Sequence, residues 1–163
     1  MSEPTSEPLR IGSAVTSVVA VVALVLAAWA VFRPSPDESQ NPSYTAEEQA
    51  QAKQKVCAAT ELVREGISRN TNLQPAGGPR DVTGSLAVAA NARVSLYMGG
   101  QYLLSRLDPA TPPDLADAVR KFADTLADIG AAATAGAQNN EPDQAARLRD
   151  ADAANARISE LCN

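Results

Sequence analysis

The chain has 163 residues, a formal net charge of −5 and no histidine. The negative charge argues against nucleic acid as a partner, because phosphates need a basic face to neutralise them. The lack of histidine removes the commonest general base, the usual zinc ligand and every Ser-His or Cys-His nucleophile pair. We therefore expect a protein that is not an enzyme and that has no cofactor and no metal site.

A long uncharged segment lies near the N-terminus, between Arg10 and Arg33. Its 22 residues, 11–32, would span roughly 33 Å as a helix, enough to cross a hydrocarbon core of about 30 Å. We expect residues 1–10 to form a short cytoplasmic tail and residues 11–32 to form a single transmembrane helix that acts as a signal anchor. The chain after Arg33 is then extracytoplasmic, and the protein is a single-pass protein of the cell membrane.

A cleaved signal peptide is the alternative to a retained anchor. Ala28-Trp29-Ala30 has the A-x-A form of a cleavage site, so that cleavage would leave a mature terminus at Val31. However, the apolar segment is longer than the roughly 7–15 residues of a signal-peptide core, and the preceding tail carries two glutamates against one arginine. Both features favour an uncleaved anchor.

One stripe of the expected membrane helix carries only small residues, at coiled-coil spacing. Small side chains allow a second membrane helix to approach closely, although an alanine-rich segment also forms such stripes by chance. The candidate membrane-helix interface consists of Ser13, Thr16, Ala20, Ala23, Ala27 and Ala30.

A polar segment, PSPDESQNP, follows the apolar stretch. Its three prolines and its lack of apolar residues are typical of an extended linker. We therefore assign residues 33–44 to a linker and residues 45–163 to an extracytoplasmic helical domain.

This domain begins with two long segments of helical periodicity. The first starts at Thr45, which has capping-box spacing to Glu48, and continues to about Asn70. A stretch rich in glycine and proline then interrupts the pattern, and the second helix runs from about Asp81 to Leu107.

Two further helices follow after short turns that contain proline. Thr111 is the candidate cap of the third helix, with Pro112 at the first helical position, and Asn140 is the candidate cap of the fourth. In the fourth helix Asn155 interrupts the apolar seam, which is typical of a residue that sets register. Short turns make neighbouring helices antiparallel, so the pattern predicts an all-α, up-down-up-down four-helix bundle.

The two cysteines are Cys57, in the first helix, and Cys162, near the end of the fourth. An even number of antiparallel helices returns the chain to the end of the bundle where it began, so we expect the two thiols to pair in a disulfide. Two paired cysteines suit an oxidising compartment, which supports the extracytoplasmic orientation. Two unpaired thiols are the alternative. We expect residues 45–56 to extend past Cys162 as a stalk outside the core.

One irregular stretch, YMGGQYLL, lies inside the second helix. Adjacent glycines in a helix interior cost about 1 kcal/mol each relative to alanine, so a compensating reason is expected. Close packing against large residues of the third helix is one such reason. The other is a surface patch for a partner or a lipid. The residues of this candidate partner patch are Tyr97, Met98, Gly99, Gly100 and Tyr102.

The whole layout resembles the alanine- and proline-rich single-pass membrane proteins of mycobacteria and related actinobacteria. The features that carry the resemblance are the SEPTSEP tail, the Val/Ala-rich apolar segment, the PSPDESQNP linker and the alanine-rich helices bracketed by Cys57 and Cys162. The resemblance implies a location in the cell envelope. It supplies no catalytic or binding residues.

Two functions follow as hypotheses. The favoured one is a non-enzymatic, membrane-anchored envelope protein, a structural or accessory subunit whose partners are the membrane and other envelope proteins. The alternative is an extracytoplasmic helical module that binds a lipid or another small apolar ligand. A well-filled core favours the first function, and an apolar cavity on the order of several hundred Å³ favours the second. The half of the bundle far from the cysteines is rich in small residues, so we expect it to be the less stable half.

Overall fold

The computed structural model describes residues 43–163. The expected tail, residues 1–10, the expected transmembrane helix, residues 11–32, and nearly all of the linker lie outside the described residues. No helix within residues 43–163 has both the length and the apolar character needed to span a bilayer. The candidate membrane-helix interface also lies outside the described residues: Ser13, Thr16, Ala20, Ala23, Ala27 and Ala30.

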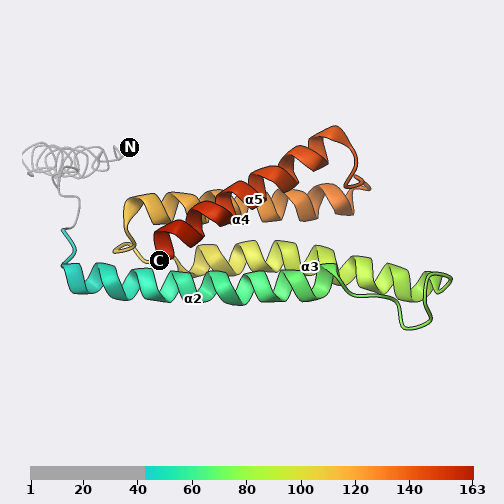
Figure 1. Cartoon of the computed structure of the whole chain (residues 1–163), viewed down its shortest axis with the longest axis horizontal. Helices are drawn as coiled ribbons and strands as arrows, with labels where there is room; N and C mark the ends of the chain where they lie inside the picture. The colour runs from blue at the N-terminus through green and yellow to red at the C-terminus, as the bar shows by residue number, and fades with distance from the viewer. Residues whose placement is uncertain (1–42) are drawn as a thin grey trace, which may run out of the picture. The chain divides into compact units, whose positions relative to one another are not determined.

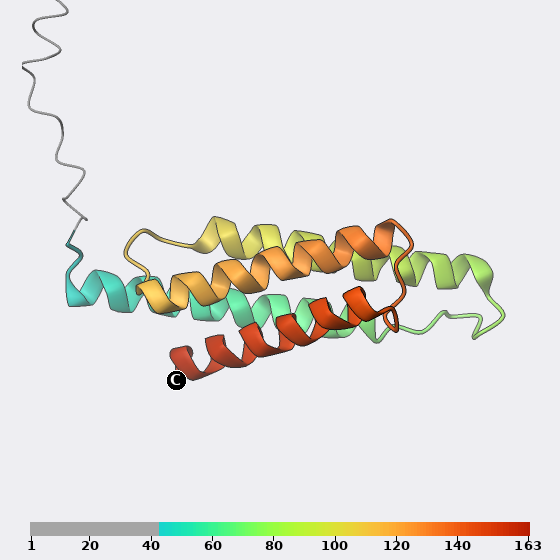
Figure 2. The same ribbon diagram turned by 90° about the horizontal axis from the view of Figure 1, so that it is seen from above.

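Four helices make up the described part of the chain (Figure 1). They are α2 (Ala46–Thr71), α3 (Val82–Arg106), α4 (Pro113–Thr134) and α5 (Pro142–Cys162). Successive helices run in opposite directions, as both views of the ribbon show (Figures 1 and 2). α2 packs along α3, α3 along α4, and α4 along α5. The all-helical, antiparallel order expected from the sequence is therefore present.

The starts of α2 and α3 follow their sequence signals. At α2 the capping box is complete, because the Glu48 N–H donates to Thr45 Oγ1 at 3.2 Å and the Thr45 N–H donates to Glu48 Oε2 at 2.8 Å. At α3 the Gly84 N–H donates to Asp81 Oδ1 at 2.8 Å, so that Asp81 is the cap.

The caps expected for α4 and α5 are wrong. Pro112 and Glu141 are the residues at the two cap positions, and neither helix start has a side-chain cap bond. Thr111 is buried in the preceding turn, where its Oγ1 accepts a hydrogen bond from the Asp108 N–H at 3.2 Å. Asn140 lies outside α5. A proline opens each of these helices and has no N–H to satisfy, which reduces the need for a cap.

The hydrophobic core lies among the four helices, and α4 contributes most to it. Apolar residues at alternating spacings of three and four place one whole stripe of α4 inside. Fully buried side chains from the other helices close the core near the disulfide: Val56 of α2, Leu103 of α3 and Ile158 of α5. The buried residues of α4 are Leu115, Ala116, Val119, Phe122, Ala123, Leu126, Ile129 and Gly130.

The start of α2 is not a stalk along its whole length. Ala52 and Val56 are buried, and Lys55 Nζ lies 3.8 Å from Asp108 Oδ2. The turn between α3 and α4 thus reaches this level of α2 and covers it. The expectation that residues 45–56 lie outside the core is therefore wrong for Ala52 and Val56.

The disulfide between Cys57 and Cys162 is confirmed. It joins α2 to α5 with the two Cα atoms 5.8 Å apart, across 105 positions of sequence. From this link α5 diverges from α2 toward the α4–α5 turn (Figure 1). α5 packs along α4 and contacts α2 only sparsely. The four helices are therefore two packed hairpins joined along α3 and α4, and they separate on the side of α2 and α5.

Candidate functional site

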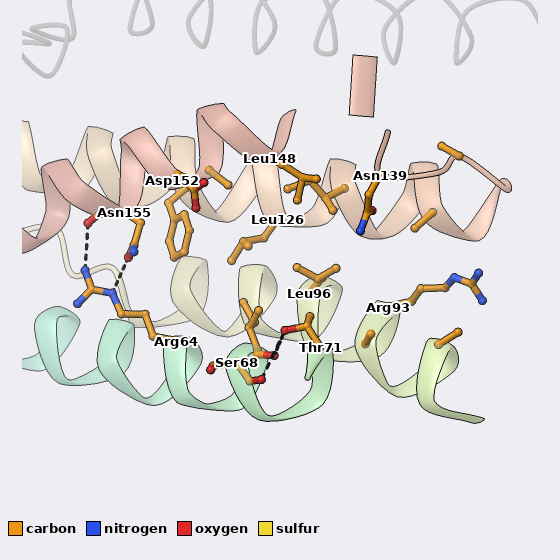
Figure 3. A pocket seen from close by; sticks show the side chains of 18 of the residues that line it. Arg64, Ser68, Thr71, Arg93, Leu96, Leu126, Asn139, Leu148, Asp152 and Asn155 are labelled. Atoms are coloured by element: carbon orange, nitrogen blue, oxygen red, sulfur yellow. Dashed lines mark hydrogen bonds between the residues drawn. The ribbon is translucent and has the colours of Figure 1, made fainter. Parts of the chain in front are cut away.

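A cleft lies where the two hairpins separate (Figure 3). Its volume is about 980 Å³, and all four helices and the α4–α5 turn line it. Leu96, Leu126 and Ile129 are nearly inaccessible to solvent, at 9%, 3% and 3%, so they form a deep floor. The apolar lining residues are Ile67, Ala89, Ala92, Leu96, Phe122, Leu126, Ile129, Ala133, Ala137, Leu148 and Ala151.

Alanine side chains and the two ends of α5 explain why this space exists. Alanine fills little volume, so alanine-rich helices either approach closely or leave a gap. The C-terminal end of α5 is held to α2 by the disulfide. Its N-terminal end is held to α4, because the buried Gln144 donates from Nε2 to the Ile129 carbonyl oxygen at 3.1 Å. With its ends attached to different helices, α5 lies at an angle across the domain and leaves the cleft beneath it.

Arg64 closes the end of the cleft nearer the disulfide. Its guanidinium donates to Asn155 Oδ1, to the Asn155 carbonyl oxygen at 3.0 Å and to Ser159 Oγ, which links α2 to α5 (Figure 3). It also donates to Glu61 Oε2 at 3.2 Å. The role of Arg64 in this link is not predicted from the sequence. The sequence signal for this link is Asn155, because a polar residue in an apolar seam needs a polar partner. That partner is Arg64 of α2.

Arg93 lies at the other end. Its side chain extends from α3 along the gap between the hairpins, on the side where Asn139 of the α4–α5 turn points into the cleft (Figure 3). Within residues 43–163, no carboxylate lies at ion-pair distance from Arg93. Asp152 is the single carboxylate among the lining residues, and it lies one helical turn from Asn155, toward the Arg64 end.

The adjacent glycines of the candidate partner patch lie at contacts between helices. A Cβ atom on Gly99 would lie 2.9 Å from Val63 Cγ1 of α2. One on Gly100 would lie 2.5 Å from the Ala123 carbonyl oxygen of α4. Each glycine therefore faces a different neighbouring helix, and the pair allows α3 to approach α2 and α4 at the same level.

The three larger residues of the candidate partner patch differ in their exposure to solvent. Tyr97 and Met98 are exposed, whereas Tyr102 is half-buried with the Arg106 guanidinium carbon 4.7 Å from its ring centroid. Tyr97 and Met98 belong to a longer row of exposed apolar side chains on α3, which we call the α3 ridge. Its members are between 51% and 72% exposed: Val82, Leu86, Val94, Tyr97 and Met98.

Residues 43–163 contain no free thiol and no cluster of metal-ligating side chains. Both cysteines are in the disulfide, and residues 43–163 contain no group of three or more acidic, cysteine or histidine side chains that could hold a metal ion. Hydrogen bonds from Thr45 lower the pKa of Glu48, and this carboxylate lies in the α2 cap rather than in the cleft.

Comparisons with protein-family models, curated proteins and solved structures found no match for this chain. The resemblance to actinobacterial single-pass membrane proteins therefore stays a prediction.

Proposed function

We propose that the domain is an extracytoplasmic, non-enzymatic module that binds a small apolar ligand between α2 and α5. The observation that supports this best is the cleft, whose volume of about 980 Å³ lies within the roughly 300–1,000 Å³ of small-molecule sites. The disulfide supports the location, because paired cysteines persist in oxidising compartments. Of the two functions expected from the sequence, we therefore favour the ligand-binding module over the interaction subunit, because the cleft leaves the core unfilled between α2 and α5.

The shape of the cleft suits an elongated ligand. Its lining residues on α4 run from Phe122 to Ala133, which is about 16 Å along a helix axis. Leu148 of α5 and Ile67 of α2 are half-buried and both line the cleft, so that an apolar chain in the cleft would remove both from water. Removal of apolar surface from water is the main driving force for such binding.

A cleft-filling substitution tests the proposal. The full chain, held in uncharged lipid nanodiscs, is irradiated with a long-chain alcohol that carries a diazirine, and the adducts are mapped by peptide mass spectrometry. We expect adducts on peptides that contain cleft residues in the wild type and their loss in Ala133→Phe, which places a ring in the cleft. The matched control is Ala131→Phe, at an exposed position of α4. Equal labelling of the three proteins at the cleft would contradict the proposal.

The α3 ridge supports the interaction subunit as a second candidate function. Val82, Leu86, Val94 and Met98 are separated by four or eight residues, so they lie on one row of the kind that packs into the groove of another helix. α3 carries no acidic residue. The partner we propose is an apolar helix of another envelope protein. A photoreactive residue at Val94 should cross-link to one partner in native membranes, whereas the same residue at the exposed Asp124 of α4 should not. Cross-links of equal yield from both positions would contradict a specific docking surface.

A further inference from the structure

We propose that the ligand of this cleft is a single-chain amphiphile with an anionic head group, and that Arg93 binds the head group. This inference rests on the proposed ligand-binding function and names the class of ligand. It is carried by the charges of the lining residues, by the different surroundings of the two arginines and by the position of Arg93 relative to the apolar floor.

The lining of the cleft is less acidic than the chain as a whole. The chain has a formal net charge of −5. Two arginines, Arg64 and Arg93, and one carboxylate, Asp152, line the cleft. Glu61 balances the charge of Arg64, which leaves the positive charge of Arg93 without an ion-pair partner among residues 43–163. A cleft with low-dielectric walls strengthens the attraction between such a charge and an anion.

The two arginines are not equivalent. Arg64 is occupied by Asn155, Ser159 and Glu61, which hold it as a link between helices. Arg93 is half-buried and has no ion-pair partner among residues 43–163. Its own helix cannot supply one, because the sequence of α3 contains no aspartate or glutamate. A guanidinium binds carboxylates and phosphates through paired hydrogen bonds, so an anionic head group matches it chemically.

Arg93 also lies at the correct place for a head group. It is one helical turn from Leu96, which belongs to the floor. An amphiphile with its head at Arg93 would therefore lay its chain over Leu96 and Leu126, toward the end closed by Arg64 (Figure 3). Asn139 points into the cleft on the Arg93 side and offers an amide donor to the same head group (Figure 3).

The test compares head groups on one chain. Diazirine-bearing hexadecanoic acid, hexadecanol and hexadecyl phosphate are titrated against the full chain in phosphatidylcholine nanodiscs, and labelling of cleft peptides is measured. We expect the acid and the phosphate to reach half-maximal labelling at about a tenfold lower concentration than the alcohol. The better of the two anions identifies the source as a free carboxylate or a phosphate head group.

Variants then assign the preference to Arg93. Arg93→Gln should remove the preference for anions and leave labelling by the alcohol unchanged, whereas Arg93→Lys should keep part of it. Arg149→Gln is the matched control, because it removes the same charge from an exposed position outside the cleft. Equal labelling by acid and alcohol in the wild type, or an equal loss of both in Arg93→Gln, would overturn the inference while the binding function stands. No labelling of the cleft by any probe would instead overturn the proposed function.

Discussion

At the scale of single residues, glycines decide how closely the helices approach. A Cβ atom on Gly66 would meet no atom within 4 Å, whereas one on Gly100 would lie 2.5 Å from a carbonyl oxygen of α4. Gly66→Ala should therefore raise the free energy of unfolding by about 0.5–1 kcal/mol, because alanine favours the helix. Gly100→Ala should lower it by about 1–3 kcal/mol, because backbone has to move. Denaturant titrations followed by circular dichroism measure both, and a Gly100→Ala protein as stable as Gly66→Ala would disprove the close contact.

The α2 cap provides a second test at this scale. Hydrogen bonds from the Thr45 N–H and then from its hydroxyl lower the pKa of Glu48 below its ordinary value of 4.5. Because the folded pKa is the lower one, the ionised carboxylate stabilises the first turn of α2 above about pH 4.5, and this contribution is lost as the pH falls through the folded pKa. In an NMR titration Thr45→Ala should raise the Glu48 pKa toward its ordinary value. The backbone N–H of residue 45 remains in this variant, so the same pKa in both proteins would mean that the Thr45 hydroxyl does not contribute to the lowered pKa.

At the scale of elements, α5 depends on the disulfide more than the other helices do. Its contacts with α2 are sparse, and the hydrogen bonds from Arg64 reach the same C-terminal half of α5 that carries Cys162. Replacement of Cys57 and Cys162 by serine should lower the free energy of unfolding by roughly 4–5 kcal/mol in the loop-entropy model. Amides of α5 should lose protection first. Reductant should lower the stability of the wild type and leave that of the serine variant unchanged. Equal sensitivity of the two proteins to reductant would contradict a stabilising disulfide.

At the scale of the whole domain, the two halves differ in their buried apolar side chains. Near the disulfide, Leu103, Leu115 and Val119 are 0–1% exposed, whereas α3 has no buried residue before Leu96. Amides of residues 84–92 and 130–137 should therefore exchange hydrogen faster than those of residues 103–107 and 115–122. Hydrogen-exchange mass spectrometry measures this, and equal protection would show that close alanine packing compensates. The cleft lies in the half expected to open more readily, which suits entry of a ligand.

Local signals in the sequence determine the four helices and, through their even number, which ends of the chain meet. The capping-box spacing at Thr45, the breaks at glycine and proline, and the apolar periodicity predict four helices whose starts lie close to the observed ones. The even number of antiparallel helices then predicts that Cys57 meets Cys162. These predictions succeed because they depend only on interactions within a few residues and on the number of helices. The caps at Thr111 and Asn140 fail because a proline opens each helix and the buried Thr111 hydroxyl bonds within the α3–α4 turn instead.

Only the tertiary structure decides where the hairpins separate. The angle of α5 depends on the disulfide at one end and on the bond from Gln144 to α4 at the other, and neither its size nor its direction is encoded by periodicity. The same angle makes Arg64 a link between helices and leaves Arg93 at the open end of a cleft, although both are arginines on alanine-rich helices. The physical reason is that a side chain's partners across a domain are set by the summed packing of all four helices, which no single segment contains.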